Sequence, residues 1–280
     1  MSNVNEQLIK ELFDQMAKAK PSLNKYLMAE EDEEDEVDVR VLADVIIKNF
    51  PWPIGVELRR LFSGSMRNLD RLRLDQLFKT IERTMQFLSF VMIADLLEKC
   101  INRSLKVPQE FINEFEKRFL VLTLGNYTWL IRIIGNIFSS SNGELFMPEL
   151  SQILNKKFYN ALDFWVPERN EIGHYQINLT EDKIEKRCVE YEEKLTFILK
   201  NLSFFVKYKL VTVREIKVLK PKHKEAQYNH VINLLNSADS DFRTREELAD
   251  IFSDSNAVLL MKDFKTPTES LNLSPLIIDT

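Results

Sequence analysis

The sequence predicts a mainly α-helical protein, a helical bundle that is followed by a small β-rich C-terminal domain. Apolar residues recur at helical spacing up to about residue 205, and β-branched runs follow from residue 206. Only 6 of the 280 residues are glycine and 9 are proline, which argues against a loop-rich all-β fold. We therefore expect three parts: an amphipathic helix and acidic linker over 1–38, a helical domain over 39–205, and a small β-rich domain over 206–280.

The composition is that of an ordinary soluble globular protein, with 45% hydrophobic and 29% charged residues. The formal net charge of -5 argues weakly against a protein coated for nonspecific nucleic-acid binding. Cys100 and Cys188 lack metal-ligand spacing, and free thiols in a cytoplasmic protein are the simplest interpretation. No apolar run approaches the roughly 20 residues that a membrane span needs, and residues 1–20 lack the apolar core of a signal peptide.

The N-terminal part begins with an amphipathic helix over 4–19, followed by a linker over 21–38 that carries an acidic run from Glu30. The helical domain then opens with a helix that ends at Pro51-Trp52-Pro53. A long helix is predicted over 71–102, because apolar residues recur along its whole length. Three further helices are expected over 108–122, 126–138 and 148–165, the last ended by Pro167.

A connection of about a dozen residues should follow Pro167. Thr180 is then a suitable N-cap for a helix to about Phe205, and the acidic Glu181 and Asp182 favour its positive end. After that helix the β-branched runs predict four strands, over 210–219, 228–235, 256–264 and 270–278.

The stretch Arg169-Asn170-Glu171-Ile172-Gly173-His174 carries the chemistry that is easiest to recognise in this chain. An imidazole can take a proton from a ribose 2′-hydroxyl or give one to a leaving oxygen near neutral pH. An arginine supplies a fixed, forked cation for the charge that develops on the phosphate. Asn170 can orient the histidine or bind a phosphate oxygen. The structural alternative is that His174 caps the backbone and Arg169 pairs with a carboxylate.

Arg-x4-His with a polar residue after the arginine resembles the signature of the HEPN superfamily (higher eukaryotes and prokaryotes nucleotide-binding). Arg169, Asn170 and His174 match it, and the stretch precedes the last long helix, as in that family. The resemblance covers roughly residues 39–205 and implies a HEPN-like helical bundle with Arg169, Asn170 and His174 as catalytic residues. Tyr175 directly follows His174, whereas HEPN toxins controlled by nucleotidylation carry the tyrosine one residue later.

The resemblance implies a metal-independent endoribonuclease that needs no cofactor and leaves a 2′,3′-cyclic phosphate and a 5′-hydroxyl. The substrate would be RNA, and the active site would form between the two subunits of a homodimer, which brings two copies of Arg169 and His174 together. The enzyme would be a regulated effector of a prokaryotic toxin or anti-phage system, held in check by a regulatory or antitoxin protein. Some HEPN domains are noncatalytic, so a dimerisation or scaffold subunit of a larger complex is the alternative.

Basic residues cluster in two further regions, which are either solvated surface or phosphate-binding surface. The candidates for weak RNA binding are Arg59, Arg60, Lys207, Lys209 and Arg214. The second region continues through Lys217, Lys220, Lys222 and Lys224. His223 and His230 have no acidic or thiol partner at a metal-ligand spacing, and we expect both on the surface.

Overall fold

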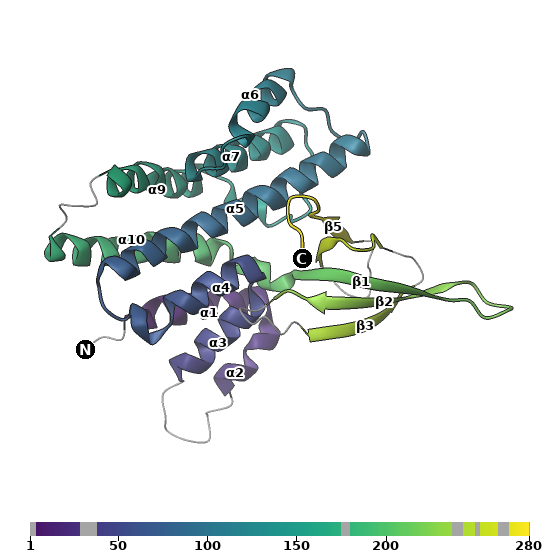
Figure 1. The fold of residues 1–280 in the computed structure, drawn as a ribbon, viewed down its shortest axis with the longest axis horizontal. Helices are drawn as coiled ribbons and strands as arrows, with labels where there is room; N and C mark the ends of the chain where they lie inside the picture. The colour runs from purple at the N-terminus through teal and green to yellow at the C-terminus, as the bar shows by residue number, and fades with distance from the viewer. Residues whose placement is uncertain are drawn as a thin grey trace. The chain divides into compact units, whose positions relative to one another are not determined.

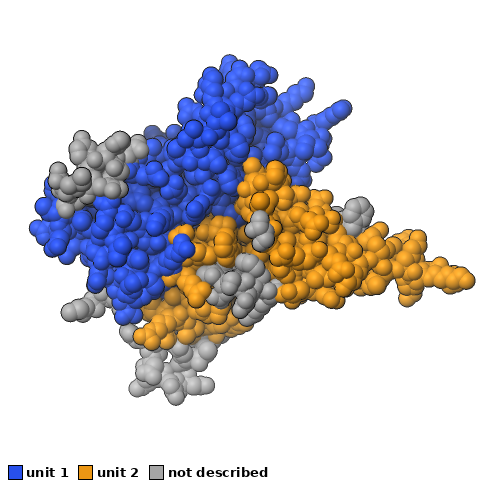
Figure 2. All heavy atoms as spheres, viewed as in Figure 1, with its two compact units in different colours: residues 1–12, 60–202 blue, residues 13–59, 203–280 orange. Residues whose placement is uncertain are grey.

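The computed structural model describes residues 4–28, 38–174, 180–236, 243–249, 253–262 and 269–279, with the backbone alone for 170–174 and 243. The chain forms two compact units, coloured separately in Figure 2. The helical unit comprises residues 1–12 and 60–202, and the sheet unit comprises 13–59 and 203–280. The boundaries therefore fall within α1 (Glu6–Ala19) and α4 (Trp52–Leu61). The predicted three parts, 1–38, 39–205 and 206–280, stay a prediction.

The expected mainly α-helical architecture with a C-terminal sheet is confirmed. The helical unit contains four long helices, α5 (Arg71–Ile101), α7 (Leu124–Ser140), α9 (Lys156–His174) and α10 (Glu181–Asn201). They pack in a closed ring, in which α5 contacts α7, α7 contacts α9, α9 contacts α10, and α10 contacts α5 (Figure 1). Shorter elements complete this unit: η2 (Gly64–Met66), α6 (Gln109–Phe119) and α8 (Leu150–Ile153). None of the helices in the described ranges is long and apolar enough to cross a membrane.

Helix α5 forms the core of the helical unit, because most of its middle turns are buried on every side. It begins at Asp70, whose carboxylate accepts a hydrogen bond from the Arg73 backbone N–H at 3.1 Å. Further along, the buried Asp95 accepts from the Phe146 backbone N–H at 2.7 Å, which fixes the loop before α8. The predicted helix over 71–102 thus matches α5 to within one residue.

The prediction of one helix over 148–165 that ends at Pro167 is wrong in two respects. First, the segment breaks after α8, because Asn155 Oδ1 accepts from the backbone N–H groups of Lys157 and Phe158 at 3.0 and 3.2 Å and starts α9 afresh. Second, α9 continues through Pro167 to His174. Pro167 lies on the exposed side of the helix, where water can hydrate the carbonyl that its ring leaves without a donor.

The sheet unit contains one antiparallel sheet in the order β3-β2-β1-β4-β5. Its strands are β1 (Lys209–Leu219), β2 (Gln227–Leu234), β3 (Arg243–Ala249), β4 (Val258–Met261) and β5 (Ser270–Asn272). A bulge at Arg214 shifts the β1–β2 register between Val213 and Glu215. Val211, Val213, Ile232, Ala257, Leu259 and Met261 form an apolar cluster on this sheet.

Helical segments before residue 60 belong to the same unit, namely η1 (Pro21–Leu23), α2 (Lys25–Met28), α3 (Val39–Asn49) and most of α4, and η3 (Ser203–Lys207) leads into β1. The buried Asn236 joins them to the sheet. Its Oδ1 accepts from the Leu210 N–H at 2.7 Å and its Nδ2 donates to the Asn49 carbonyl at 3.1 Å. The acidic run over 30–36 lies outside the described residues.

Three further features of the fold differ from the sequence prediction. Helix α4 and strand β3 were not expected, and β3 is rich in charged residues that pair with β2 as an edge strand. His230 is buried rather than exposed, because its Nε2 accepts from the Ser253 N–H at 3.1 Å, while Nδ1 lies 3.1 Å from the Tyr228 carbonyl. His223 is exposed as expected.

Candidate functional site

Helix α9 carries Arg169 and is fixed in the bundle by apolar side chains and ion pairs. Phe158, Leu162 and Trp165 form its buried stripe. On its outer side, Asp163 receives two hydrogen bonds from Arg132 Nη2 of α7, at 2.8 and 2.7 Å. The helix that presents the predicted catalytic arginine is therefore anchored on both its buried and its exposed side.

Arg169 points from α9 towards α5 and pairs with Glu82. Its Nη2 lies 3.4 and 3.3 Å from the two carboxylate oxygens of Glu82. The Arg169 side chain is 47% exposed and that of Glu82 is 29% exposed. The guanidinium is thus accessible to a phosphate, but a carboxylate already neutralises part of its charge.

A cluster of aromatic rings supports the turn of α9 that precedes Arg169. Phe78 of α5 packs edge-on against Trp165 and Tyr191, with ring centroids 5.4 and 5.3 Å apart. The Tyr191 hydroxyl on α10 donates a hydrogen bond to the Glu168 carboxylate. Burial, followed by this hydrogen bond and the charge of Glu168, raises the pKa of Tyr191, so the phenol stays protonated and keeps donating. Arg169 therefore follows directly after a residue that is locked to α10.

The six-residue motif lies in the last turns of α9, and not in a long connection as the sequence predicted. Helix α9 includes every motif residue, and only positions 175–180 of the sequence separate it from α10. In a helix, positions 170 and 174 share a face, whereas positions 169 and 174 are about 140° apart around the axis. The side chains of Asn170 and His174, and all of Tyr175, lie outside the described residues.

The predicted RNA-binding residues are spread over both units. Arg59 ends the α4 part of the sheet unit, Arg60 starts the second segment of the helical unit, and both are exposed. Lys207, the last residue of η3, is also exposed. In β1, Lys209 is half-buried, and burial and then the charge of the nearby Lys20 lower the pKa of Lys209 to about 8.

Arg214, at the bulge in β1, forms an ion pair with Asp279 at 3.0 Å. Its guanidinium is therefore already engaged within the sheet unit. The two cysteines are free thiols, Cys188 buried and Cys100 half-buried, and burial raises the pKa of Cys188 to about 11. Neither thiol is a thiolate near neutral pH on this account.

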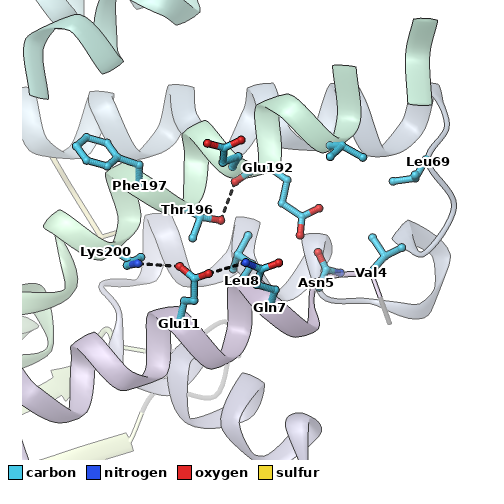
Figure 3. A pocket seen from close by; sticks show the side chains of 12 residues that line it. Val4, Asn5, Gln7, Leu8, Glu11, Leu69, Glu192, Thr196, Phe197 and Lys200 are labelled. Carbon is cyan, nitrogen blue, oxygen red and sulfur yellow. Dashed lines mark hydrogen bonds and ion pairs between the residues drawn. The ribbon is translucent and has the colours of Figure 1, made fainter. Parts of the chain in front are cut away.

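A cavity of about 550 Å³ lies within the helical unit between α1 and α10. Figure 3 shows the Glu11–Lys200 pair at one end and Asn5 and Glu192 at the other. Hydrogen bonds from Lys200, at 2.7 Å, and from Gln7 lower the pKa of Glu11. None of the predicted catalytic residues lines this cavity.

Beside this cavity lies the buried Arg73, whose side chain donates to Asn5 Oδ1 and the Met66 carbonyl, both at 2.7 Å, and to the Glu192 carboxylate. The polar groups around the cavity thus mostly satisfy one another. This arrangement joins α1, α5 and α10, and among the described residues it leaves no nucleophile and proton donor aimed at a common point, so we assign it a structural role.

Glu82, Glu168 and Tyr191 are parts of the candidate site that the sequence prediction missed. They lie 87, 1 and 22 positions from Arg169 in the sequence, and the pattern of charges along α5 and α10 gave no sign of which would face it. Comparison of the chain with family models, with curated proteins and with solved structures finds no match. A functional proposal for this chain therefore depends on Arg169 and the residues around it.

Proposed function

We propose that the chain is a metal-independent endoribonuclease of the HEPN type. The observation that carries the proposal is an accessible arginine, Arg169, held at the end of a helix in a closed four-helix ring and followed by an asparagine and a histidine. The setting of this stretch, directly before the last long helix of the ring, is the one the HEPN resemblance implies.

In the proposed reaction the 2′-hydroxyl of a ribose attacks the adjacent phosphorus. His174 takes the hydroxyl proton, Arg169 stabilises the charge that grows on the phosphate oxygens, and the bond to the 5′-oxygen breaks. A second imidazole gives a proton to that leaving oxygen, so that a 2′,3′-cyclic phosphate and a 5′-hydroxyl result. DNA lacks the 2′-hydroxyl and should not be cleaved.

A single chain offers one Arg169 and one His174, and the reaction uses two proton-transfer groups. The separation of about 140° between positions 169 and 174 favours a site in which two chains each contribute one face of α9. We therefore propose a homodimer with a composite active site. Control by a regulatory or antitoxin protein, in a prokaryotic toxin or anti-phage setting, is the biological role that we propose for such an enzyme.

A second candidate function has one observation in its favour. Arg169 is paired with Glu82, as it would be if it only tied α9 to α5. In that case the chain is a noncatalytic dimerisation or scaffold subunit of the same helical type. The two proposals differ in what happens when Arg169 or His174 is replaced.

The deciding experiment incubates purified full-length protein with labelled total RNA and tRNA in EDTA, beside His174→Ala and Arg169→Ala. The nuclease proposal expects cleavage by the wild type alone, with 2′,3′-cyclic phosphate ends, and unchanged folding of both variants. Equal cleavage by all three proteins contradicts it. An absence of cleavage at every concentration, together with dimers that both substitutions leave intact, favours the scaffold.

A further inference from the structure

The β1–β2 hairpin of the sheet unit extends well beyond β4 on one side, and its last residue pair and turn extend beyond β3 on the other. Strand β1 pairs with β4 only over Lys209–Thr212, whereas its pairing with β2 continues to Leu219 opposite Gln227. On the other side, β3 pairs with β2 from Leu234 to Tyr228. The outer part of the hairpin, which we call the ribbon, is therefore open along its β1 edge, and only the Leu219–Gln227 pair and the turn extend beyond β3. It is the long green projection in Figure 1.

The end of this ribbon, residues 217–224, is strongly basic. We call these residues the ribbon tip. It holds four lysines and no acidic residue in eight positions, in a chain whose formal net charge is -5. Lys220, Lys222, His223 and Lys224 are exposed, and Lys217 has one weak partner, Glu215 at 3.4 Å. The ribbon tip thus presents the kind of positive charge that attracts a polyanion.

The ribbon tip also exposes apolar side chains beside its charges. Val218 is 62% exposed and Leu219 is 47% exposed. Val218 lies opposite Tyr228 in the register, so the apolar side chain and the half-buried aromatic ring share one face of the ribbon. Bases and riboses of a nucleic acid offer apolar contacts to such groups.

The turn at the ribbon tip is restrained by a backbone hydrogen bond and by a proline. The Lys224 N–H donates to the Pro221 carbonyl at 3.2 Å, and the pyrrolidine ring of Pro221 fixes the backbone between Lys220 and Lys222. A turn restrained in this way loses less conformational entropy on binding than an unrestrained one. The lysines closer to the sheet differ, since Lys209 is half-buried and Arg214 is paired.

We propose that the ribbon tip is an RNA-binding element, with Lys220, Lys222 and Lys224 on the phosphates and Val218 and Leu219 against riboses and bases. The choice of RNA among polyanions rests on the proposed function. The charge of the ribbon tip and the geometry of the ribbon are independent of that function. An anionic membrane is a poorer fit, because two exposed apolar side chains bury little area in a lipid surface.

The test measures binding without cleavage, by fluorescence anisotropy of a labelled 20-nucleotide single-stranded RNA in the full-length His174→Ala background. The tip variant carries Lys220→Gln, Lys222→Gln and Lys224→Gln. The matched control carries Lys106→Gln, Lys156→Gln and Lys186→Gln, three exposed lysines of the helical unit, and changes the net charge equally. We expect the tip variant to raise Kd at least about tenfold and the control less than about twofold.

The salt dependence gives an independent readout of the same phosphate contacts. Each phosphate of a single strand that the protein no longer neutralises lowers the slope of log K against log salt by about 0.7, so the slope of the tip variant should be smaller by about 2. Val218→Ser with Leu219→Ser should weaken binding but keep the slope, because these side chains touch no phosphate in the proposal.

Equal losses of affinity in the tip variant and the control, or no loss in the tip variant, would overturn the proposal. Binding to vesicles of anionic phospholipid with none to RNA would overturn it too. The result is separable from the nuclease proposal. A wild type that binds RNA through the tip but never cleaves it refutes only the nuclease, and a tip variant that binds and cleaves normally refutes only the ribbon.

Discussion

Replacing Arg169 by alanine should abolish cleavage while leaving the fold almost unchanged. The Arg169–Glu82 pair is partly exposed, with side chains 47% and 29% accessible and a closest N–O distance of 3.3 Å. Ion pairs of this kind contribute about 0.2–1 kcal/mol to stability. The free energy of unfolding of Arg169→Ala should therefore fall by about 1 kcal/mol or less, a decrease in Tm of at most about 4 °C.

The effect on cleavage should be much larger than the effect on stability. A fixed donor to the charge of the transition state is typically worth about 10²–10³ in rate, so we expect kcat/KM to fall at least about 100-fold. Glu82→Gln should act in the opposite direction, because it removes the carboxylate that competes with phosphate for Arg169. An ion pair of at most about 1 kcal/mol corresponds to a rise in kcat/KM of up to about fivefold.

The assay combines thermal unfolding followed by circular dichroism with cleavage of labelled RNA in EDTA. Arg132→Ala is the matched control, since Arg132 also lies on the bundle, is 41% exposed and pairs with a carboxylate of α9, Asp163, away from the motif. It should cost similar stability and leave cleavage intact. The reasoning fails if both alanine variants lose cleavage equally, or if Arg169→Ala unfolds the protein at the assay temperature.

Three other predictions concern stability and are measured by denaturant unfolding. Arg73→Met should lower the free energy of unfolding by about 3 kcal/mol or more, because it leaves Glu192 and Asn5 without their buried partner. Arg71→Met, beside Asp75 on the surface, should lower it by less than about 1 kcal/mol. Equal losses in the two variants would contradict this prediction. Trp165→Ala should lower the free energy of unfolding by about 3–5 kcal/mol. Trp165→Phe should lower it much less, because the indole N–H bonds to no described residue. A Phe variant as unstable as the Ala variant would contradict this expectation. Lys209→Met should stabilise the protein at pH 7 by up to about 3 kcal/mol, because the pKa of Lys209 is about 8 in the folded state and 10.5 in the unfolded state. The wild type should regain that stability as the pH rises from 8 to 10.5, where Lys209 loses its charge. A gain in stability that does not depend on pH would rule out titration of Lys209 as its cause.

The helices that could be predicted from the sequence are those whose periodicity and caps agree. Helix α5 has an apolar residue on the core side of every turn and Asp70 at its start, and α10 follows Thr180 as expected. The strands β1 and β2 are indicated by β-branched runs, and both lie within one residue of the predicted range. In these segments local preference and tertiary burial favour the same structure.

The errors arise where tertiary contacts decide. A proline usually ends a helix, but α9 continues through Pro167. The residues before and after Pro167 are held by neighbouring helices, Trp165 by α5 and Glu168 by α10. Strand β3 has a sequence poor in strand formers and exists because β2 offers it an open edge. Arg73 lies in a stretch rich in arginine, a residue that is mostly exposed in proteins, yet it is fully buried and bonds to partners 68 and 119 residues away.

The candidate site shows the same division between local and distant information. The motif itself is local, so the sequence alone is enough to propose Arg169, Asn170 and His174, which stay a prediction. Glu82, in contrast, reaches Arg169 only through the packing of α5 and α9 in the folded bundle. The basic region after residue 200 illustrates the point for charge. Counting lysines treats Lys209 and Lys222 alike, whereas the fold half-buries the first and exposes the second on a ribbon.

A binding surface for a polyanion needs charges that are exposed, unpaired and carried together on one element. In the sheet unit the ribbon tip meets these conditions better than the base of the same hairpin, where Arg214 is held by Asp279. Removing a paired charge also releases its acidic partner, so the net change at the base of the hairpin is small. For this reason Arg214→Gln should weaken RNA binding less than Lys222→Gln, although each removes one positive charge. Anisotropy titrations of the two single variants compare their affinities for RNA directly. A larger loss of affinity for Arg214→Gln would indicate that RNA binds at the base of the hairpin and not at the ribbon tip.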